Sequence, residues 1–459
     1  MKRKFIIIDP GLIRLGGHNY TLAVNFSDAA HALGYDVLWF CHKTFPTALV
    51  PDYVRADAVF SLSYYKTSRL RWLRVRLYDW LSDRLAGMSP PSPRAAWLSR
   101  WVSPYARELE AALDRHRVAA TDHAFITTAE YLQYAALLSL FAAGPRDRLP
   151  FFHVRTSYDE SAILNSRFGA RLPGLFRRFR DLGVVNSRVY FYAETATLAA
   201  HYGRLDLVSF EALENPAPSR LPAAARVRRG DDAERPLTII CPGQARTEKG
   251  YLRLPAIIAA LQARADVSRP FRIVLQSYLR ASGKNDRARR KDVDRRAATN
   301  ALRRFPNTVV RLLEQPLTND AYYTLFAEGD IVLLPYDREH YRHRSSMVAS
   351  EAALFGKPMV VTADTAMAAA AQPGASESAG TDEAFAAALA KIINDYGAYE
   401  AAAAARAETL HRRLDGRALV DRMIERTGRR AGGCQGTTER PDRGKQATPE
   451  TDPRTLGGA

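Results

Sequence analysis

Ser345, Ser346 and Glu351 are spaced so that together they could bind a phosphorylated ligand. The two serines, with Met347 and Val348 after them, stand where a helix is expected to begin behind a polar loop. Small residues at a helix start leave main-chain N–H groups accessible, and the helix dipole favours an anion beside them. Glu351 falls about one turn into this helix, where its carboxylate can accept hydrogen bonds from hydroxyl groups. The sequence therefore predicts a diphosphate at residues 345–348, with Glu351 close to it.

A second group of residues, earlier in the chain, could neutralise the charge of that diphosphate. Gly243, Arg246 and Lys249 lie in the loop Pro242–Tyr251, directly after an expected strand. Departure of a nucleoside diphosphate develops negative charge, and an Arg–Lys pair stabilises that charge without a metal ion. Taken alone, the loop is better explained as solvated surface. Its position ahead of the segment that contains Glu351 favours a role in the diphosphate site. We therefore expect no metal ion, and no cofactor besides the diphosphate-containing substrate.

The residues around Glu351 predict the elements that must hold it in place. Asp330–Tyr336 is a buried strand that ends in a polar loop, and Gly356 stops the helix that follows. Pro358–Thr362 is the next strand. A strand, loop, helix and strand in this order place the start of the helix at the carboxyl edge of a parallel sheet, where α/β proteins bind their ligands.

Residues 330–362 resemble the donor half of GT-B-fold glycosyltransferases, in particular family-4-like enzymes (glycosyl transferases group 1). In that family the glutamate in the place of Glu351 binds the ribose of the nucleotide, and the preceding turn binds the diphosphate. The family also carries an arginine and a lysine in the earlier loop. Arg246 and Lys249 match them, although Arg246 lies two positions later than in the commonest version.

One position departs from the family pattern. Many members carry a Glu-x7-Glu pair whose first glutamate contacts the donor sugar, and His343 stands there in this chain. The resemblance therefore implies that His343 lies at the donor, but it leaves the identity of the sugar open.

The first part of the chain offers less specific candidates. Gly16 and Gly17 follow the first expected strand and resemble the family's glycine loop, although a tight turn explains them equally well. His153 lies near the end of an expected strand, where many relatives place a histidine facing the donor sugar. A core or surface histidine is at least as good an explanation, and the same holds for His18 and Arg155.

Strands that alternate with helices predict an α/β protein with two Rossmann-like doubly wound domains facing each other across a cleft, the GT-B architecture. We expect an acceptor-side domain at residues 1–216, a linker at 217–235 and a donor domain at 236–428. Residues 429–459 hold few apolar side chains and are expected to be a disordered tail.

The formal net charge of +17 favours polyanionic neighbours such as phosphorylated substrates or anionic headgroups. The segment Lys66–Arg84 reads as a basic amphipathic helix with tryptophans, which can lie on an anionic membrane surface. A core-facing helix with a solvated arginine face explains it slightly better. Arg177, Arg178 and Arg180 form a second basic cluster. No nucleic-acid motif accompanies these charges, so we expect no nucleic-acid partner.

The chain is expected to be cytoplasmic, with peripheral contact at the inner face of the cell membrane as an option. Only four apolar residues follow the basic start of the sequence, fewer than a signal peptide requires. No apolar run reaches the roughly 18–20 residues of a membrane span. The three cysteines show no metal-binding or redox spacing.

Together these observations predict a hexosyltransferase-type glycosyltransferase that moves a sugar from a nucleotide-diphospho-sugar to a glycan or lipid-linked acceptor, as in polysaccharide biosynthesis. The resemblance implies that it is retaining and metal-independent. Two alternatives stay open: a non-catalytic two-domain protein that binds a sugar or nucleotide, and a sugar-nucleotide epimerase of the same fold. The epimerase would need cleft acids in the first domain, which the sequence does not reveal.

Overall fold

The computed structural model describes residues 2–15, 18–61, 93–159, 172–218, 235–279 and 286–428. Several predicted features lie outside these ranges. They are the glycine pair Gly16–Gly17, the basic segment Lys66–Arg84, most of the linker and the tail 429–459. Among the described residues, no helix combines the length and apolar character that crossing a bilayer requires.

The first domain is built on a parallel sheet of seven strands in the order β3-β2-β1-β4-β5-β6-β7. The strands are β1 Lys4–Asp9, β2 Asp36–His42, β3 Val54–Phe60, β4 His123–Ile126, β5 Phe151–Thr156, β6 Val189–Ala193 and β7 Phe210–Ala212. Its helices and short 3-10 turns are α1 His18–Ala32, η1 Thr47–Leu49, α3 Pro93–Arg115, α4 Tyr131–Ala143, η2 Arg146–Arg148, α6 Leu172–Asp181 and α7 Ala196–Gly203.

Both faces of this sheet are buried, as the continuous apolar runs of its strands predict. Along β1, Ile6 and Ile8 pack into the core beneath α3, α4 and α6. Phe5 and Ile7 point to the opposite face, where α1 packs. The alternation follows from the two-residue period of a strand.

The second domain has a parallel sheet of six strands in the order β10-β9-β8-β11-β12-β13. The strands are β8 Leu237–Cys241, β9 Phe271–Gln276, β10 Val310–Leu313, β11 Ile331–Leu334, β12 Met359–Thr362 and β13 Ser376–Ala379. Its 3-10 turns and helices are η4 Thr247–Lys249, η5 Tyr251–Arg253, α8 Leu254–Gln262, α9 Asp286–Leu302, α10 Asn319–Glu328, α11 Arg338–Tyr341, α12 Met347–Leu354, α13 Ala366–Ala370, α14 Asp382–Asn394 and α15 Tyr396–Arg413.

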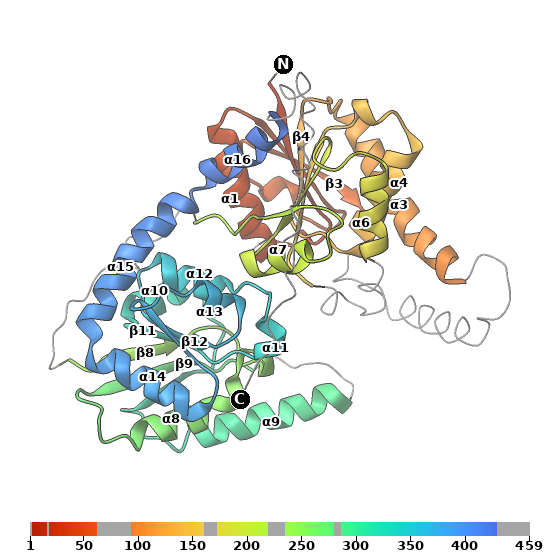
Figure 1. Ribbon diagram of the computed structural model, residues 1–459. Coiled ribbons are helices and arrows are strands. Elements are labelled where there is room, and N and C mark those ends of the chain that lie inside the picture. Colours follow the sequence, from red (N-terminus) through yellow and green to blue (C-terminus); the bar gives the residue numbers. More distant parts are fainter. Residues whose placement is uncertain are drawn as a thin grey trace, which may run out of the picture.

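The final helix, α16 Gly416–Gly428, returns to the first domain. Figure 1 shows α15 running along the side of the second domain and α16 crossing to α1. Leu419, Val420 and Met423 enter the core that contains Phe5 and Ile7. The residues expected to end the second domain therefore complete the core of the first, so the two domains are joined by two chain segments rather than one.

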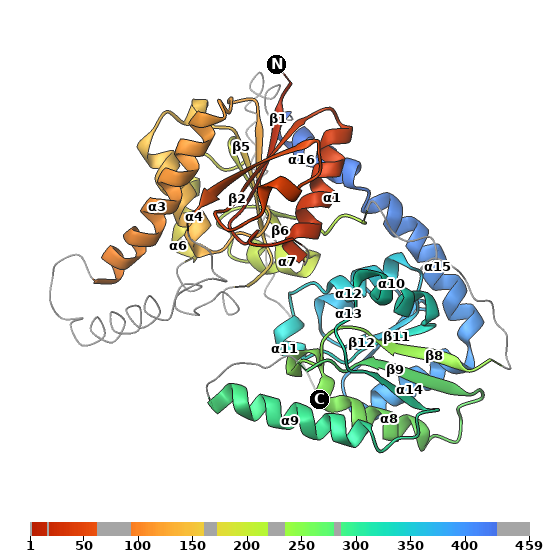
Figure 2. The ribbon, with the colours of Figure 1, turned by 180° about the vertical axis from the view of Figure 1, so that it is seen from behind.

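The two domains face each other with the carboxyl ends of their central strands toward the interface, as seen from both sides in Figures 1 and 2. Helix α7 of the first domain lies next to α13 of the second. This is the arrangement in which doubly wound domains bind a shared ligand.

Candidate functional site

Glu351 occupies a buried position inside α12, one turn after the helix begins. The hydroxyl of Tyr322, on α10, donates a hydrogen bond of 2.6 Å to Glu351 Oε2. Burial raises the pKa of Glu351 to about 7, although the Tyr322 hydrogen bond and the charge of Lys249 act in the opposite direction. The carboxyl group therefore changes its charge near neutral pH and keeps its second oxygen available to a ligand.

The start of α12 has the features of an anion site. Ser346 is the N-cap, and its side chain accepts a hydrogen bond from the amide of Ala349 at 3.3 Å. Met347 and Val348 are the first two residues of the helix, whose main-chain N–H groups have no carbonyl partner within it. The main-chain N–H donors predicted within residues 345–348 therefore lie at an observed helix start. We call residues 343–348, which lead into this helix, the donor turn.

The loop after β8 is shaped by two glycines in left-handed backbone conformations. Gly243 has φ +109°, and its amide donates a hydrogen bond of 2.6 Å to Gln276 Oε1. A Cβ atom at this position would lie 2.6 Å from Lys249 Nζ. Gly250 has φ +72°, and a Cβ there would lie 1.8 Å from the carbonyl oxygen of Pro335. The glycines thus let the loop close tightly around Lys249 and against the end of β11.

Replacing Gly250 with alanine is therefore expected to destabilise the second domain by about 2–4 kcal/mol, since both the backbone conformation and the contact with Pro335 become strained. Chemical denaturation measures this loss. Gly174→Ala is the matched control, because a Cβ at Gly174 meets no atom within 4 Å and the residue lies in helix α6. It should change stability by less than about 1 kcal/mol. Equal effects of the two substitutions would contradict the close packing of the loop.

Lys249 is the cation that the loop brings nearest to Glu351. Its ammonium lies 5.6 Å from the centre of the Tyr336 ring. Burial and the neighbouring charge of Arg246 lower its pKa, whereas the negative charges of Glu248 and Glu351 oppose this. Arg246 is exposed and forms an ion pair with Glu248. Because these two positive charges repel each other, an anion bound between Arg246 and Lys249 would stabilise both of them.

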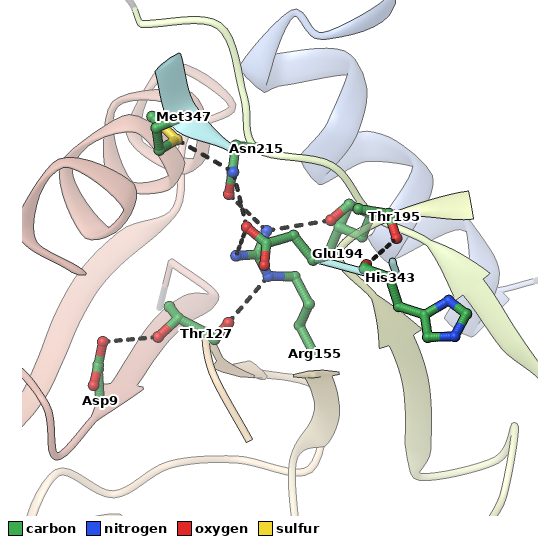
Figure 3. Close-up of polar contacts among 9 residues, drawn as sticks. Asp9, Thr127, Arg155, Glu194, Thr195, Asn215, His343 and Met347 are labelled. Carbon is green, nitrogen blue, oxygen red and sulfur yellow. Dashed lines mark hydrogen bonds and ion pairs between the residues drawn. The ribbon is translucent and has the colours of Figure 1, made fainter. Parts of the chain in front are cut away.

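The first domain contributes a buried polar cluster at the interface, drawn in Figure 3. Arg155 has no solvent exposure, and it donates to the carbonyl of Thr127 at 3.0 Å and to Asn215 Oδ1 at 2.9 Å. Its Nη2 lies 3.7 Å from Glu194 Oε1. Asn215 Nδ2 in turn donates to Glu194 Oε1 at 2.9 Å. These contacts fix the carboxylate of Glu194 at the end of β6.

Asp9, the last residue of β1, lies at the far side of this cluster. It accepts hydrogen bonds from the Thr127 hydroxyl at 2.9 Å and from Asn19 Nδ2 at 3.1 Å. Burial raises the pKa of Asp9, and the hydrogen bonds from Thr127, Gly11 and Asn19 oppose that effect. Asp9 and Glu194 are thus acids of the first domain beside the cleft, which the sequence alone did not reveal.

The other predicted residues of the first domain are placed differently. His153 is completely buried, with its ring nitrogens 3.1 Å from His123 Nδ1 and 3.2 Å from the Tyr192 hydroxyl. It lies within the core of the sheet, apart from the cluster around Arg155. His18 is exposed at the start of α1, although the surrounding protein lowers its pKa by desolvation and the charge of Glu194 opposes this. Gly16 and Gly17 lie outside the described residues.

His343 is turned toward the first domain. Its ring packs against the ring of His201 on α7, with the ring centres 4.6 Å apart and the planes tilted by 37°. Its carbonyl accepts a hydrogen bond of 2.8 Å from the Thr195 hydroxyl. Burial and His201 lower the pKa of His343, so a neutral imidazole is favoured. The position of the family's sugar-binding glutamate is thus used for a contact between domains.

A cavity of about 340 Å³ lies between the domains, behind α12. Ala349, Ser350 and Ala353 line it from one face of the helix, whereas Glu351 and Lys249 are not among its lining residues. Glu194, Thr195 and Asn215 approach it from the first domain, together with Ser345 and Ser346 of the donor turn. The cavity therefore lies on the side of the donor turn that faces Asn215 and Leu414, close to the segments that join the domains, and it is separate from Glu351.

Of the residues that were not predicted, some had a signal in the sequence. Glu194 directly follows an expected strand, and Asp9 ends the first one, so each stands at a strand end where a cleft is expected. Tyr322 carried no such signal, because it lies on an ordinary amphipathic helix.

Comparisons with known proteins agree with the architecture. No protein-family model matches the chain, and no curated protein sequence matches it. Solved structures match nearly the whole chain at low sequence identity.

The UDP-forming α,α-trehalose-phosphate synthase from Burkholderia xenovorans is 14% identical, with a TM-score of 0.62 over 94% of this chain and 100% of that one. The E. coli trehalose-6-phosphate protein bound with UDP-2-fluoro glucose is 13% identical, with a TM-score of 0.63 over 93% and 99%. Sucrose-phosphate synthase from Thermosynechococcus elongatus is 13% identical, with a TM-score of 0.60 over 92% and 98%. The predicted GT-B architecture is therefore confirmed.

Proposed function

We propose that the protein is a glycosyltransferase that takes its sugar from a nucleotide-diphospho-sugar. The observation that supports this most is the convergence of two segments distant in sequence. The Arg246–Lys249 loop meets the donor turn and Glu351 at the carboxyl edge of the second sheet, where the charges of Lys249 and Glu351 act on each other. Cations, N–H donors and a carboxylate are the groups that a diphosphate and a ribose require.

In this proposal the second domain holds the donor. Arg246 and Lys249 bind the diphosphate, the N–H groups of the donor turn add hydrogen bonds, and Glu351 accepts from the ribose hydroxyls. The bond between the sugar and the diphosphate breaks and its electron pair goes to the leaving oxygen. An acceptor hydroxyl forms the new bond to the sugar and gives its proton to the released diphosphate. The two cations stabilise the leaving charge, so this step needs no metal ion.

The structural neighbours add independent support for the donor class. The names of two of them state a trehalose-phosphate synthase that forms UDP and a protein bound with UDP-2-fluoro glucose. We therefore place UDP-sugars first among the donors. The acceptor stays a glycan, a lipid-linked sugar or a sugar phosphate, and retention of configuration stays part of the proposal. Membrane contact through Lys66–Arg84 also stays a prediction, because that segment lies outside the described residues.

An epimerase would need acids able to exchange protons in the first domain. Glu194 is held ionised, since the positive charge of Arg155 lowers its pKa to about 2 although burial acts in the opposite direction. Asp9 is occupied by three hydrogen-bond donors. These contacts favour structural roles for both acids and therefore a transferase.

A donor screen tests the proposal. The full chain is incubated with UDP-, GDP- and ADP-sugars, with and without sugar phosphates or lipid-linked acceptors, and released nucleoside diphosphate is measured. We expect release from one nucleotide class, increased by the correct acceptor. Binding without release would support the non-catalytic alternative, and conversion of the donor sugar without release would support the epimerase.

Nucleotide affinity should rise with pH between about 6 and 8. The ligand-free pKa of Glu351 is about 7, so the carboxyl is mostly protonated below that pH. Only the ionised form can accept from both ribose hydroxyls, and binding below pH 7 must therefore release a proton. Calorimetry at several pH values measures the slope. Glu351→Gln serves as the reference that removes the titration of the nucleotide itself, and equal slopes in both proteins would contradict the assignment.

A further inference from the structure

The donor turn is contacted by the first domain as well as by its own. Two side chains of the first domain reach it: the Thr195 hydroxyl donates to the carbonyl of His343 at 2.8 Å, and Asn215 Nδ2 donates to Met347 Sδ at 3.3 Å. Glu194 acts through Asn215, because Glu194 Oε1 accepts a hydrogen bond of 2.9 Å from the same Nδ2 atom. Figure 3 shows Thr195 beside His343 and Asn215 beside Met347.

These contacts matter because the turn borders a cavity on one side, where side-chain packing cannot hold it in place. The cavity of about 340 Å³ lies there, and Ser345, Ser346 and Ala349 border it. A backbone segment beside a cavity lacks the van der Waals contacts that hold a close-packed loop in one conformation. Hydrogen bonds from Thr195 and Asn215 therefore help to fix its position.

The first domain presents these groups rigidly. Glu194 is 4% exposed and Arg155 is fully buried. Arg155 is itself anchored on the carbonyls of Thr127 and Leu213, at 3.0 and 3.2 Å. A side chain held by several hydrogen bonds loses little further freedom when it engages the turn, so the contact is effective.

We propose that Thr195 and Asn215 are positioning residues that hold the donor turn in its binding conformation, and that Glu194 is a positioning residue that acts through Asn215. This inference rests on the proposed function for the identity of the ligand. The bracing of the turn itself can be tested without any ligand, because an unbraced turn should open more often.

The first test is hydrogen–deuterium exchange of residues 343–348 in the ligand-free full chain. Glu194→Gln and Thr195→Val should each raise exchange there, and Thr195→Ser should restore it. Two control substitutions reproduce the loss of a charge and the loss of a helix cap at other positions. Glu211→Gln removes the same charge from an ion pair with Arg426 in the first domain, and Thr381→Val removes a helix cap like that of Thr195 from α14. Neither control should change exchange in the donor turn.

The second test is affinity for whichever of UDP, GDP and ADP binds the wild type best. Loss of one bracing hydrogen bond should weaken binding by about 5- to 10-fold. Asn215→Ala should weaken it similarly, and Glu194→Gln should add nothing in the Asn215→Ala background if it acts through that residue. For an enzyme with turnover, the effect should fall on KM for the donor more than on kcat.

The outcomes separate the two proposals. If Glu194→Gln does not fold, Thr195→Val and its serine rescue decide the question. Folded variants with unchanged exchange and unchanged affinity would overturn the bracing role. If the wild type binds none of the three nucleotides, the proposed function fails, while the exchange experiment still decides whether the first domain holds the turn.

Discussion

Replacing Lys249 with methionine is expected to lower kcat for sugar transfer by about 10²- to 10³-fold, the usual cost of losing one group that stabilises a developing charge. Methionine keeps the apolar stem that the glycine loop encloses and removes only the ammonium. Only Arg246 of this pair would then stabilise the leaving diphosphate, and Arg246 is exposed and already forms an ion pair with Glu248. Steady-state release of nucleoside diphosphate measures the effect.

Lys391→Met provides the matched control for this substitution. Lys391 also lies in the second domain and is paired with Glu377 at 2.7 Å, but it is exposed on α14. Its loss should leave kcat within about twofold of the wild type, as for surface ion pairs in general. A Lys249→Met protein with wild-type kcat would show that the loop does not stabilise the leaving group.

Replacing Glu351 with alanine is expected to weaken nucleotide binding by about 100-fold, equivalent to roughly 3 kcal/mol for a buried carboxylate that accepts hydrogen bonds. The substitution leaves the cations and the donor turn in place, so the loss should come from the ribose. Calorimetric titration with the nucleoside diphosphate measures it.

A nucleotide without ribose hydroxyls makes this prediction specific. A 2′,3′-dideoxynucleoside diphosphate should bind the wild type about 100-fold more weakly, and Glu351→Ala should weaken it no further. Glu377→Ala is the control, because Glu377 accepts from Tyr399 much as Glu351 accepts from Tyr322, yet it lies on β13. If Glu351→Ala weakens both nucleotides equally, Glu351 supports the helix rather than the ribose.

The sequence predicted the central strands well, because buried parallel strands consist of apolar runs that no surface segment imitates. Ile331–Leu334 and Met359–Thr362 lie where those runs indicate. β13 was not predicted, since its sequence Ser376–Ala379 has no such run. Its pairing with β12 forms the strand, and pairing between segments cannot be seen in the local sequence.

The path of the last helices shows a second limit of sequence reasoning. Helix α15 ends at Arg413 and α16 begins at Gly416, although both lie within the range expected to form the second domain. Both helices have apolar residues at helical spacing, but this spacing does not indicate which domain core each apolar face packs against. Leu419 and Met423 pack in the first domain, which the spacing of apolar residues alone could not reveal.

The candidate residues of the second domain could be proposed from the sequence because two short stretches contain them, whereas the interdomain cluster draws on residues far apart in the chain. Arg155 and Glu194 lie at strand ends, but only the fold brings them together with Asn215. His343 illustrates the same point. Its register matched a sugar-binding position, but its ring faces His201 across the interface. Orientation of a side chain toward one of two domains is a tertiary property.

Titration calorimetry of the full chain with UDP, GDP and ADP examines the donor site most directly. We expect one of the three to bind at micromolar or tighter affinity to the wild type, and we expect the double variant Lys249→Met with Glu351→Ala to lose binding while keeping its fold. No binding by the wild type, or undiminished binding by the folded double variant, would contradict a nucleotide-diphosphate site formed by the Arg246–Lys249 loop and helix α12.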